Sequence, residues 1–584
     1  MRKVADCSFV HFVYPFLFDA AQFDQRVKRL EEVTCQSGTK ANEDVPMWVP
    51  LWKEKGFPRD DMLAYVAGYL NPKDPEQATA RVWKLNDRLH ESFGLAGRAD
   101  WELYKKERKK ERAIPFRFGE LGSGSFAVQL AFFRTGVGFL TVSVRPVSDD
   151  VDEWLNFISN FRFVNGQRQF AVRATKRAKN EASGEIEHHE FFPSIASDPG
   201  AGPAASESAI PLTNDLRPHT AGDAIRDNHQ RQFIQVLDGM LRSANVRADE
   251  KPWWVDVFIP EQMVPFAVVY VDGAGESIEP GSSIAGNVAK AAPVELDRTD
   301  ERRREDYHLI YMLRNFFNSS QGGSPAPEDL AADHPSLVPY AARCWFLFSL
   351  DGGAFLACDA PQTDFFRKTM PDHLRDQYFL LLLIVMHQRF TLMSISNDVV
   401  KKWLIEKDDE KRAEAFAQIR DRLLGFTAHG LFSQVMQREH HHRSYRKWQQ
   451  VFQIQDLYHE VRDEVREMHD YLQTRRAERI KELAEARQRQ MKKQAEAAQE
   501  RGARLEWIIG LLGICFGVPA LVMGFLNINI PGITTNDEGL KLWLAFVVVL
   551  AASVIVVGGI LLMMRRYINR ATKQKGDQQN GDGE

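Results

Sequence analysis

Two side-chain amides and one carboxylate mark the ends of a long uncharged stretch near the C-terminus. Asn527 and Asn529 lie at one end and Glu506 at the other, and no charged side chain occurs from Trp507 to Asn536. Neutral oxygen donors can hold a hydrated divalent cation such as Mg²⁺, which gives up its water ligands reluctantly. We therefore interpret the two amides as candidates for the mouth of an ion pathway, formed where several copies of the chain surround one axis.

Small residues connect these two ends at helical spacing. From Glu506 to Asn527 the intervals alternate between four and three residues, which places the whole set on one helix face. Its intermediate members are Gly510, Gly513, Gly517, Ala520 and Gly524. Such a face can line a conduit, with Glu506 as a ring of acids at the inner end. It can also pack against another helix without any pore, because Gly513 and Gly517 form a small-xxx-small pair.

Two uncharged runs predict two membrane-spanning helices, over residues 507–528 and 542–564. Each run is long enough to cross a hydrocarbon core roughly 30 Å thick. Basic residues precede the first run and fill the tail 565–584, whereas the loop 529–541 carries Asp537 and Glu538. The positive-inside rule then places both termini in the cytoplasm of a multi-pass protein of the plasma (inner) membrane. An acidic outer loop would concentrate cations electrostatically.

A long stalk helix of coiled-coil character is predicted over residues 431–506. No Gly or Pro occurs from Leu431 to Arg501, and apolar residues recur at intervals of three or four. At 1.5 Å per residue such a helix is on the order of 100 Å long. Near its start lies His440-His441-His442, a candidate metal site. Consecutive residues of a helix point in different directions, so these side chains cannot all bind one ion.

The first 430 residues are predicted to form an α+β cytosolic domain. Residues 1–177 and 224–430 would be its two parts, separated by a flexible linker or insertion at 178–223 that is rich in Ser, Ala, Gly and Pro. Ser8–Phe18 is expected to be a buried strand, and Tyr378–Met386 a buried helix too short to span a membrane. A further helix is expected over Pro75–Phe93.

Two β-hairpins are also expected in this domain. Phe126–Phe133 and Phe139–Val144 would form the first. Cys344–Leu350 and Ala354–Cys358 would form the second, around the turn Asp351-Gly352-Gly353.

The composition excludes several classes of function. A formal net charge of −4 gives no indication of a nucleic-acid partner. The 5 cysteines are scattered without a CxxC motif, which indicates reduced thiols in a cytosolic environment. The chain has no GxSxG, HExxH or P-loop motif, so we expect neither an enzyme nor a permanently bound cofactor.

The order of these parts resembles the CorA superfamily of divalent-cation channels and transporters, and its ZntB branch in particular. Asn527-Ile528-Asn529 stands where the family has Gly-x-Asn, so Asn529 takes the place of the signature Asn, and Ile530-Pro531-Gly532 follows. Pro519 corresponds to a proline common in that span. The resemblance implies a homopentamer in the lipid bilayer that transports Mg²⁺ or Zn²⁺, with Asn529 as the principal ion contact and the cytosolic domain as its gate.

A second hypothesis uses the same parts differently. The large cytosolic domain would bind a small-molecule ligand such as a nucleotide, and the spans would form a ligand-gated pore or an anchor without selective metal transport. The substitution of Asn527 for the signature Gly and the Gly-lined helix face favour this hypothesis. The acidic outer loop favours the first.

Overall fold

The computed structural model describes a sheet-containing region and a long helix. The described residues are 2–36, 44–51, 61–70, 78–90, 95, 100–106, 111–119, 126–163, 170–179, 186–195, 209–210, 212–217, 240–244, 253–256, 262–273, 293–318, 323, 325–330, 334–526 and short pieces between 547 and 566. The contacts divide the chain into two units, Met1–Asp470 and Tyr471–Glu584. We call the first of these the sheet unit.

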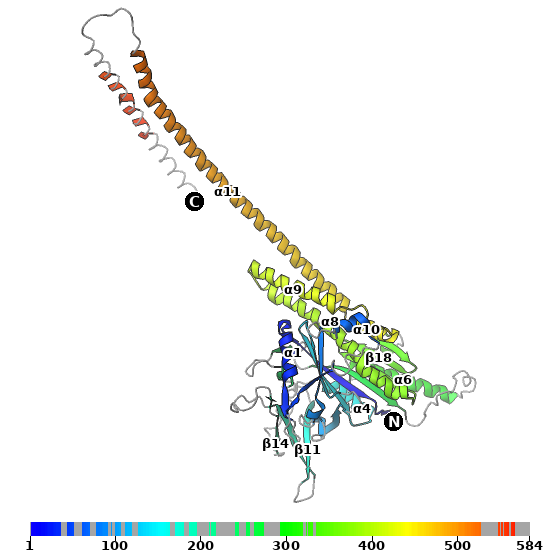
Figure 1. Ribbon diagram of the computed structural model, residues 1–584. Helices are drawn as coiled ribbons and strands as arrows, with labels where there is room; N and C mark the ends of the chain where they lie inside the picture. Colours follow the sequence, from blue (N-terminus) through cyan, green and yellow to red (C-terminus); the bar gives the residue numbers. More distant parts are fainter. Residues whose placement is uncertain are drawn as a thin grey trace, which may run out of the picture. The chain divides into compact units, whose positions relative to one another are not determined.

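A 16-stranded mixed sheet forms the centre of the sheet unit (Figure 1). Its main path runs β14-β12-β11-β7-β8-β10-β2-β16-β19-β18-β17. Neighbours on this path are antiparallel, apart from β16 and β19, which run parallel. The central strands are β2 (Phe9–Phe18), β10 (Val137–Pro146), β16 (Val264–Asp272) and β19 (Gly352–Cys358).

The other strands belong to this sheet, except for β13, β3 and β4, which form a separate three-stranded sheet. They are β1 (Lys3–Val4), β3 (Thr34–Gln36), β4 (Asp44–Pro46), β5 (Trp48–Pro50), β6 (Ala80–Leu85), β7 (Asp100–Lys106), β8 (Glu111–Phe118), β9 (Val128–Phe133), β11 (Phe170–Lys179), β12 (Ile186–Ile195), β13 (Ala209–Ile210), β14 (Leu212–Arg217), β15 (Trp254–Asp256), β17 (Leu337–Ala341) and β18 (Cys344–Ser349). The α-helices are α1 (Phe23–Glu32), α3 (Ala64–Leu70), α4 (Val151–Phe161), α6 (Pro293–Asn315), α7 (Met370–His373), α8 (Phe379–Asp398), α9 (Asp409–His429), α10 (Glu439–Val451) and α11 (Ile454–Leu526).

Helices cover both faces of the central strands. On one face, Phe12 of β2 packs against Phe161 of α4, with ring centroids 4.7 Å apart. On the other face, His11 lies 4.5 Å from the ring of Phe379 in α8. A strand buried on both sides needs apolar residues at nearly every position, which explains the continuous run in β2 and confirms the predicted buried strand.

The apolar helix α8 belongs to the core of the sheet unit. Within the described ranges, one helix, Phe365–Leu404, is long and apolar enough to cross a membrane, and 83% of its apolar window is buried. Its His387 ring stacks on Phe133 at 4.1 Å, and Phe390 lies 6.3 Å from Phe139. The prediction of a buried helix at Tyr378–Met386 is therefore confirmed.

Both predicted hairpins are present. Strands β9 and β10 pair antiparallel, and Gly136 between them has φ 86°, a conformation that favours glycine. Strands β18 and β19 pair antiparallel around the Asp351-Gly352-Gly353 turn. The four described cysteines, Cys7, Cys35, Cys344 and Cys358, are free, as the scattered spacing predicts.

Gly353 allows α10 to pack directly on the sheet. A Cβ atom at this position would lie 2.3 Å from the ring of Trp448 in α10. We expect Gly353→Ala to lower the free energy of unfolding by about 1–3 kcal/mol, because the indole ring must move from its packed position. Gly425→Ala in α9 is the control, since no atom lies within 4 Å there and it should stabilise by about 0.5–1 kcal/mol. Chemical unfolding of both variants measures the difference, and equal effects would contradict the packing argument.

Two predicted segments differ from the structure. The helix expected at Pro75–Phe93 is instead strand β6 over part of its length, paired with β5 and β9. Ala80 to Trp83 are all buried, so this strand lacks the alternation of buried and exposed residues that would have identified it as a strand. The segment 178–223, expected to be a flexible linker or an insertion, contains strands β12 and β14, which pair with each other and continue the sheet beyond β11.

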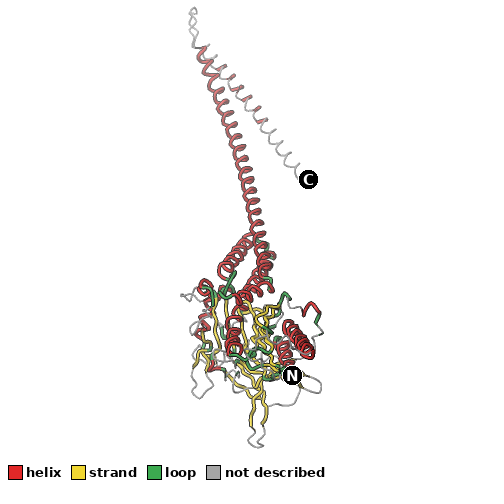
Figure 2. Tube along the Cα trace, turned by 90° about the vertical axis from the view of Figure 1, so that its right-hand side faces the viewer, coloured by secondary structure: helices red, strands yellow, loops and turns green. Residues whose placement is uncertain are grey.

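The predicted stalk is two helices rather than one. α10 ends at Val451 and α11 begins at Ile454, and between them Gln453 has φ 54°. α11 then continues through Gly502 to Leu526 without a break (Figure 2). The described chain is thus a mixed α/β sheet unit and a long helix.

Candidate functional site

The small-residue face predicted as pore lining lies on α11, and no described residue covers its glycines. Added Cβ atoms at Gly510, Gly513, Gly517 and Gly524 would meet no atom within 4 Å. Ala520 and Glu506 are exposed as well. The structure therefore places these predicted residues together on one helix. The predicted ion mouth (Asn527 and Asn529) and the acidic loop residues (Asp537 and Glu538) lie outside the described residues.

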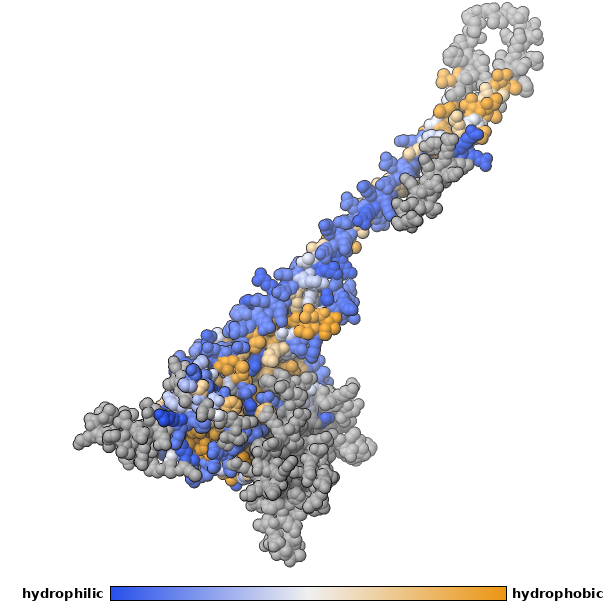
Figure 3. Space-filling model, turned by 180° about the vertical axis from the view of Figure 1, so that it is seen from behind, coloured by the Kyte–Doolittle hydropathy of each residue, from blue (hydrophilic) through white to orange (hydrophobic). Residues whose placement is uncertain are grey.

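Large apolar side chains surround this face and are also exposed. Trp507, Phe516 and Leu521 are 50%, 73% and 66% exposed. Figure 3 shows the change along α11 from hydrophilic to hydrophobic residues. Exposed apolar surface of this extent marks contact with lipid or another protein surface. The two apolar helices therefore differ in exposure, because the sheet buries the apolar residues of α8.

The three consecutive histidines lie on α10, and two of them, His440 and His441, pack against aromatic rings. The His441 ring is buried, 4.7 Å from the ring of Tyr378 and 4.3 Å from that of His440. Burial, together with the neighbouring His440, lowers the pKa of His441 to about 4. Among the residues that the structure describes, no group of three His, Cys, Asp or Glu side chains is arranged to hold a metal ion. Metal binding at His440, His441 and His442 stays a prediction.

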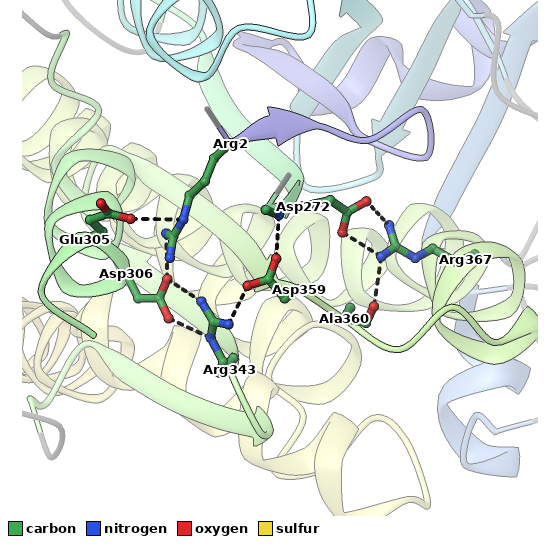
Figure 4. Close-up of polar contacts among 9 residues, drawn as sticks. Arg2, Asp272, Glu305, Asp306, Arg343, Asp359, Ala360 and Arg367 are labelled. Atoms are coloured by element: carbon green, nitrogen blue, oxygen red, sulfur yellow. Dashed lines mark hydrogen bonds and ion pairs between the residues drawn. The ribbon is translucent and has the colours of Figure 1, made fainter. Parts of the chain in front are cut away.

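A network of arginines and carboxylates joins distant parts of the sheet unit (Figure 4). Asp306 of α6 accepts a hydrogen bond from Nη1 of Arg2 at 2.7 Å. It also accepts from Nε and Nη2 of Arg343, at 2.8 Å and 3.0 Å. Nη1 of Arg343 donates to Asp359, and Arg2 also pairs with Glu305 at 3.2 Å. The network therefore ties the N-terminus to α6 and to the ends of β18 and β19.

A second pair extends this network to the end of β16. Arg367 donates two hydrogen bonds to Asp272, at 2.9 Å and 2.6 Å, and one to the carbonyl of Ala360. The backbone N–H of Gly273 donates to Asp359. Because β16 and β19 are parallel, their carboxyl ends meet here, the edge where α/β sheets commonly place ligand sites.

The electrostatics of the network fit a clamp. Burial raises the pKa of the Asp359 carboxyl, but the Gly273 N–H and Arg343 outweigh it and bring that pKa below its usual value. Arg343 and Asp359 have φ 57° and 49°, which is uncommon for residues other than glycine. Each of the three arginines is matched by carboxylates among the described residues, so the cluster holds strand ends together.

Sequence reasoning did not find this network. Arg2 and Asp306 are 304 positions apart. Neither residue belongs to a motif, and the position of the N-terminus depends on long-range pairing such as that of β1 with β16. No local pattern could have identified the pair.

Comparison with protein-family models, with curated proteins and with solved structures gave no match for this chain.

Proposed function

We propose that this protein is a homo-oligomeric membrane channel or transporter for divalent cations, gated by its cytosolic sheet unit. The observation that carries the proposal is the apolar end of α11, whose large side chains are exposed in the described part of the chain. Residues 507–528 would be the first membrane span and 542–564 the second. Lipid and neighbouring copies would then cover the surface that the single chain exposes.

Assembly of several copies follows from the same helix. A chain with two spans cannot enclose a pore, so the pathway requires an oligomer, and the CorA resemblance implies a pentamer. Every side chain from 473 to 510 is exposed in the single chain, including Ile480, Leu483 and Met491. A coiled-coil stalk would bury these apolar residues between copies.

The small-residue face would connect the inner end of the pathway to its outer mouth. With Glu506 inside and Asn529 outside, the face from Gly510 to Gly524 would line the conduit. Ring-forming amides of Asn529, with Asn527 beside them, would hold hydrated Mg²⁺ or Zn²⁺ at the mouth. Asp537 and Glu538 would attract the ions from outside.

Flux through the reconstituted protein tests this function. We expect full-length protein in liposomes to conduct Mg²⁺ or Zn²⁺, and Asn529→Ala to abolish the flux, because the ring loses its oxygen donors. Asn569→Ala in the tail is the matched control and should conduct normally. Normal flux in Asn529→Ala and Asn527→Ala alike would disprove the assignment of the mouth. Inserted wild-type protein that conducts neither ion would disprove the function.

A further inference from the structure

A cavity of about 730 Å³ opens at the junction of α10 and α11. Leu337 and Val338 of β17 form its apolar wall. Side chains of α10 and of the first turn of α11 form the opposite, polar wall. Small-molecule sites in proteins commonly have volumes of about 300–1,000 Å³, so the cavity has room for a ligand of nucleotide size.

The polar wall is cationic and largely without protein partners. It contains three basic side chains, Arg443, Arg446 and Lys447, against one acid, Asp456. Arg443 and Arg446 form no hydrogen bond or ion pair with other described residues, whereas Lys447 donates to Gln450 at 3.1 Å. This differs from the network of Figure 4, in which carboxylates occupy the arginines. Unpaired guanidinium groups are well suited to bind phosphate in a bidentate manner.

The start of α11 adds to this positive field. The first N–H groups of a helix have no partner within the helix and favour an anion. Gln453, which precedes α11, and Gln455, in its first turn, both line the cavity. Their side-chain amides form no hydrogen bond with other described residues and can donate to a phosphate or a polar ring.

The cavity also lies at the bend between two helices that have different anchors. α10 is fixed to the sheet, since Trp448 packs 4.8 Å from Phe348 and the Tyr445 hydroxyl donates to the Phe432 carbonyl at 2.6 Å. α11 follows Gln453, whose φ of 54° is uncommon for a residue with a side chain. The first turns of α11 are fixed to α8, since Glu464 accepts a hydrogen bond from the Ser396 hydroxyl at 3.2 Å. A ligand that contacts both helices would favour one angle between them.

We propose that this cavity binds a soluble, phosphate-bearing small molecule of nucleotide size, and that its binding regulates the ion pathway through α11. Arg443 and Arg446 would bind the phosphate groups, and Leu337 and Val338 would contact the less polar part of the ligand. The regulatory part rests on the proposed channel function, whereas the binding part does not.

Binding to full-length protein in nanodiscs of zwitterionic lipid tests the site. The probes are ATP, tripolyphosphate and inositol trisphosphate in metal-free buffer, with adenosine as the probe that lacks phosphate. We expect saturable binding of a phosphate probe and none of adenosine. Arg443→Gln/Arg446→Gln should weaken this binding by about tenfold or more. The double variant Arg466→Gln/Arg479→Gln removes the same charge from exposed positions of α11 and should bind as the wild type does.

The outcomes separate the site from the channel. Tighter binding of ATP than of inositol trisphosphate supports a nucleotide, and the reverse would overturn the soluble ligand in favour of a lipid headgroup. Equal affinity in wild type and Arg443→Gln/Arg446→Gln, or no saturable binding of any phosphate probe up to about 1 mM, would overturn the site. Phosphate binding by a protein that conducts no ions would disprove the channel and leave the site intact. Ion flux that does not respond to the bound probe would overturn the regulatory role.

Discussion

Replacing Asp306 by Ala is expected to lower the free energy of unfolding by about 3 kcal/mol or more, because it removes one partner of a buried ion network. The Asp306 side chain is 5% exposed and receives hydrogen bonds from both Arg2 and Arg343. Arg343 keeps Asp359 and Arg2 keeps Glu305, so each cation retains one carboxylate. This compensation places the effect near the lower end of the range for breaking a buried pair.

Glu305→Ala provides the matched control. Glu305 is the preceding residue and pairs with the same Arg2, but its side chain is 54% exposed. Exposed pairs contribute about 0–1 kcal/mol, so this variant should unfold close to the wild type. Chemical unfolding of the full-length protein in detergent measures both. Equal losses would show that burial of the network does not contribute to stability.

Acidification is expected to destabilise the sheet unit through its buried histidines. Burial lowers the pKa of His387 to about 3 and that of His441 to about 4. Burial, together with Arg375, also brings the pKa of His11 well below its usual value. Since the unfolded chain binds these protons near pH 6.5, stability is complete above that pH and falls as the pH drops toward the folded values. Each histidine contributes a slope of about 1.4 kcal/mol per pH unit in this window.

His441→Phe isolates one of these contributions. The His441 ring nitrogens are buried and have no hydrogen-bond partner among the described residues, so Phe can occupy the space without losing a hydrogen bond. We expect the slope of the unfolding free energy against pH, between pH 6.5 and pH 4, to decrease by about 1.4 kcal/mol per pH unit, which corresponds to one proton. His459→Phe, at an exposed position of α11, should leave the slope unchanged. An unchanged slope in His441→Phe would contradict the assignment.

Residue patterns within a short segment predicted those parts of the fold that burial or turn geometry of that segment determines. β2 is rich in aromatic and β-branched residues because both faces are buried, and the Asp351-Gly352-Gly353 turn needs residues that tolerate its backbone. At β6 the apolar residues matched helical spacing by coincidence, and pairing with β5 and β9 decided the outcome. Such pairing depends on residues far away in the sequence.

The candidate sites show the same limit. The small residues of α11 could be placed on one face from their spacing alone, whereas the lipid and the other copies that we propose as their cover are not encoded in that spacing. The cavity at the α10–α11 junction had no signal in the sequence, because the bend occurs at Gln453 without a Gly or Pro. The basic residues of α10 form a cavity wall only in the folded structure, in which residues of β17 line the same cavity.

The parallel pairing of β16 with β19 has a consequence for biosynthesis. The centre of the sheet combines β2 near the N-terminus with β16 and with β19, which ends at Cys358. The core therefore cannot close until the ribosome has made that strand, and the proposed first span begins at Trp507, 149 residues later (507 − 358). At about 5–20 residues per second, roughly 7–30 seconds separate the two events. The central strands of the sheet unit thus have time to pair before the proposed first span is synthesised.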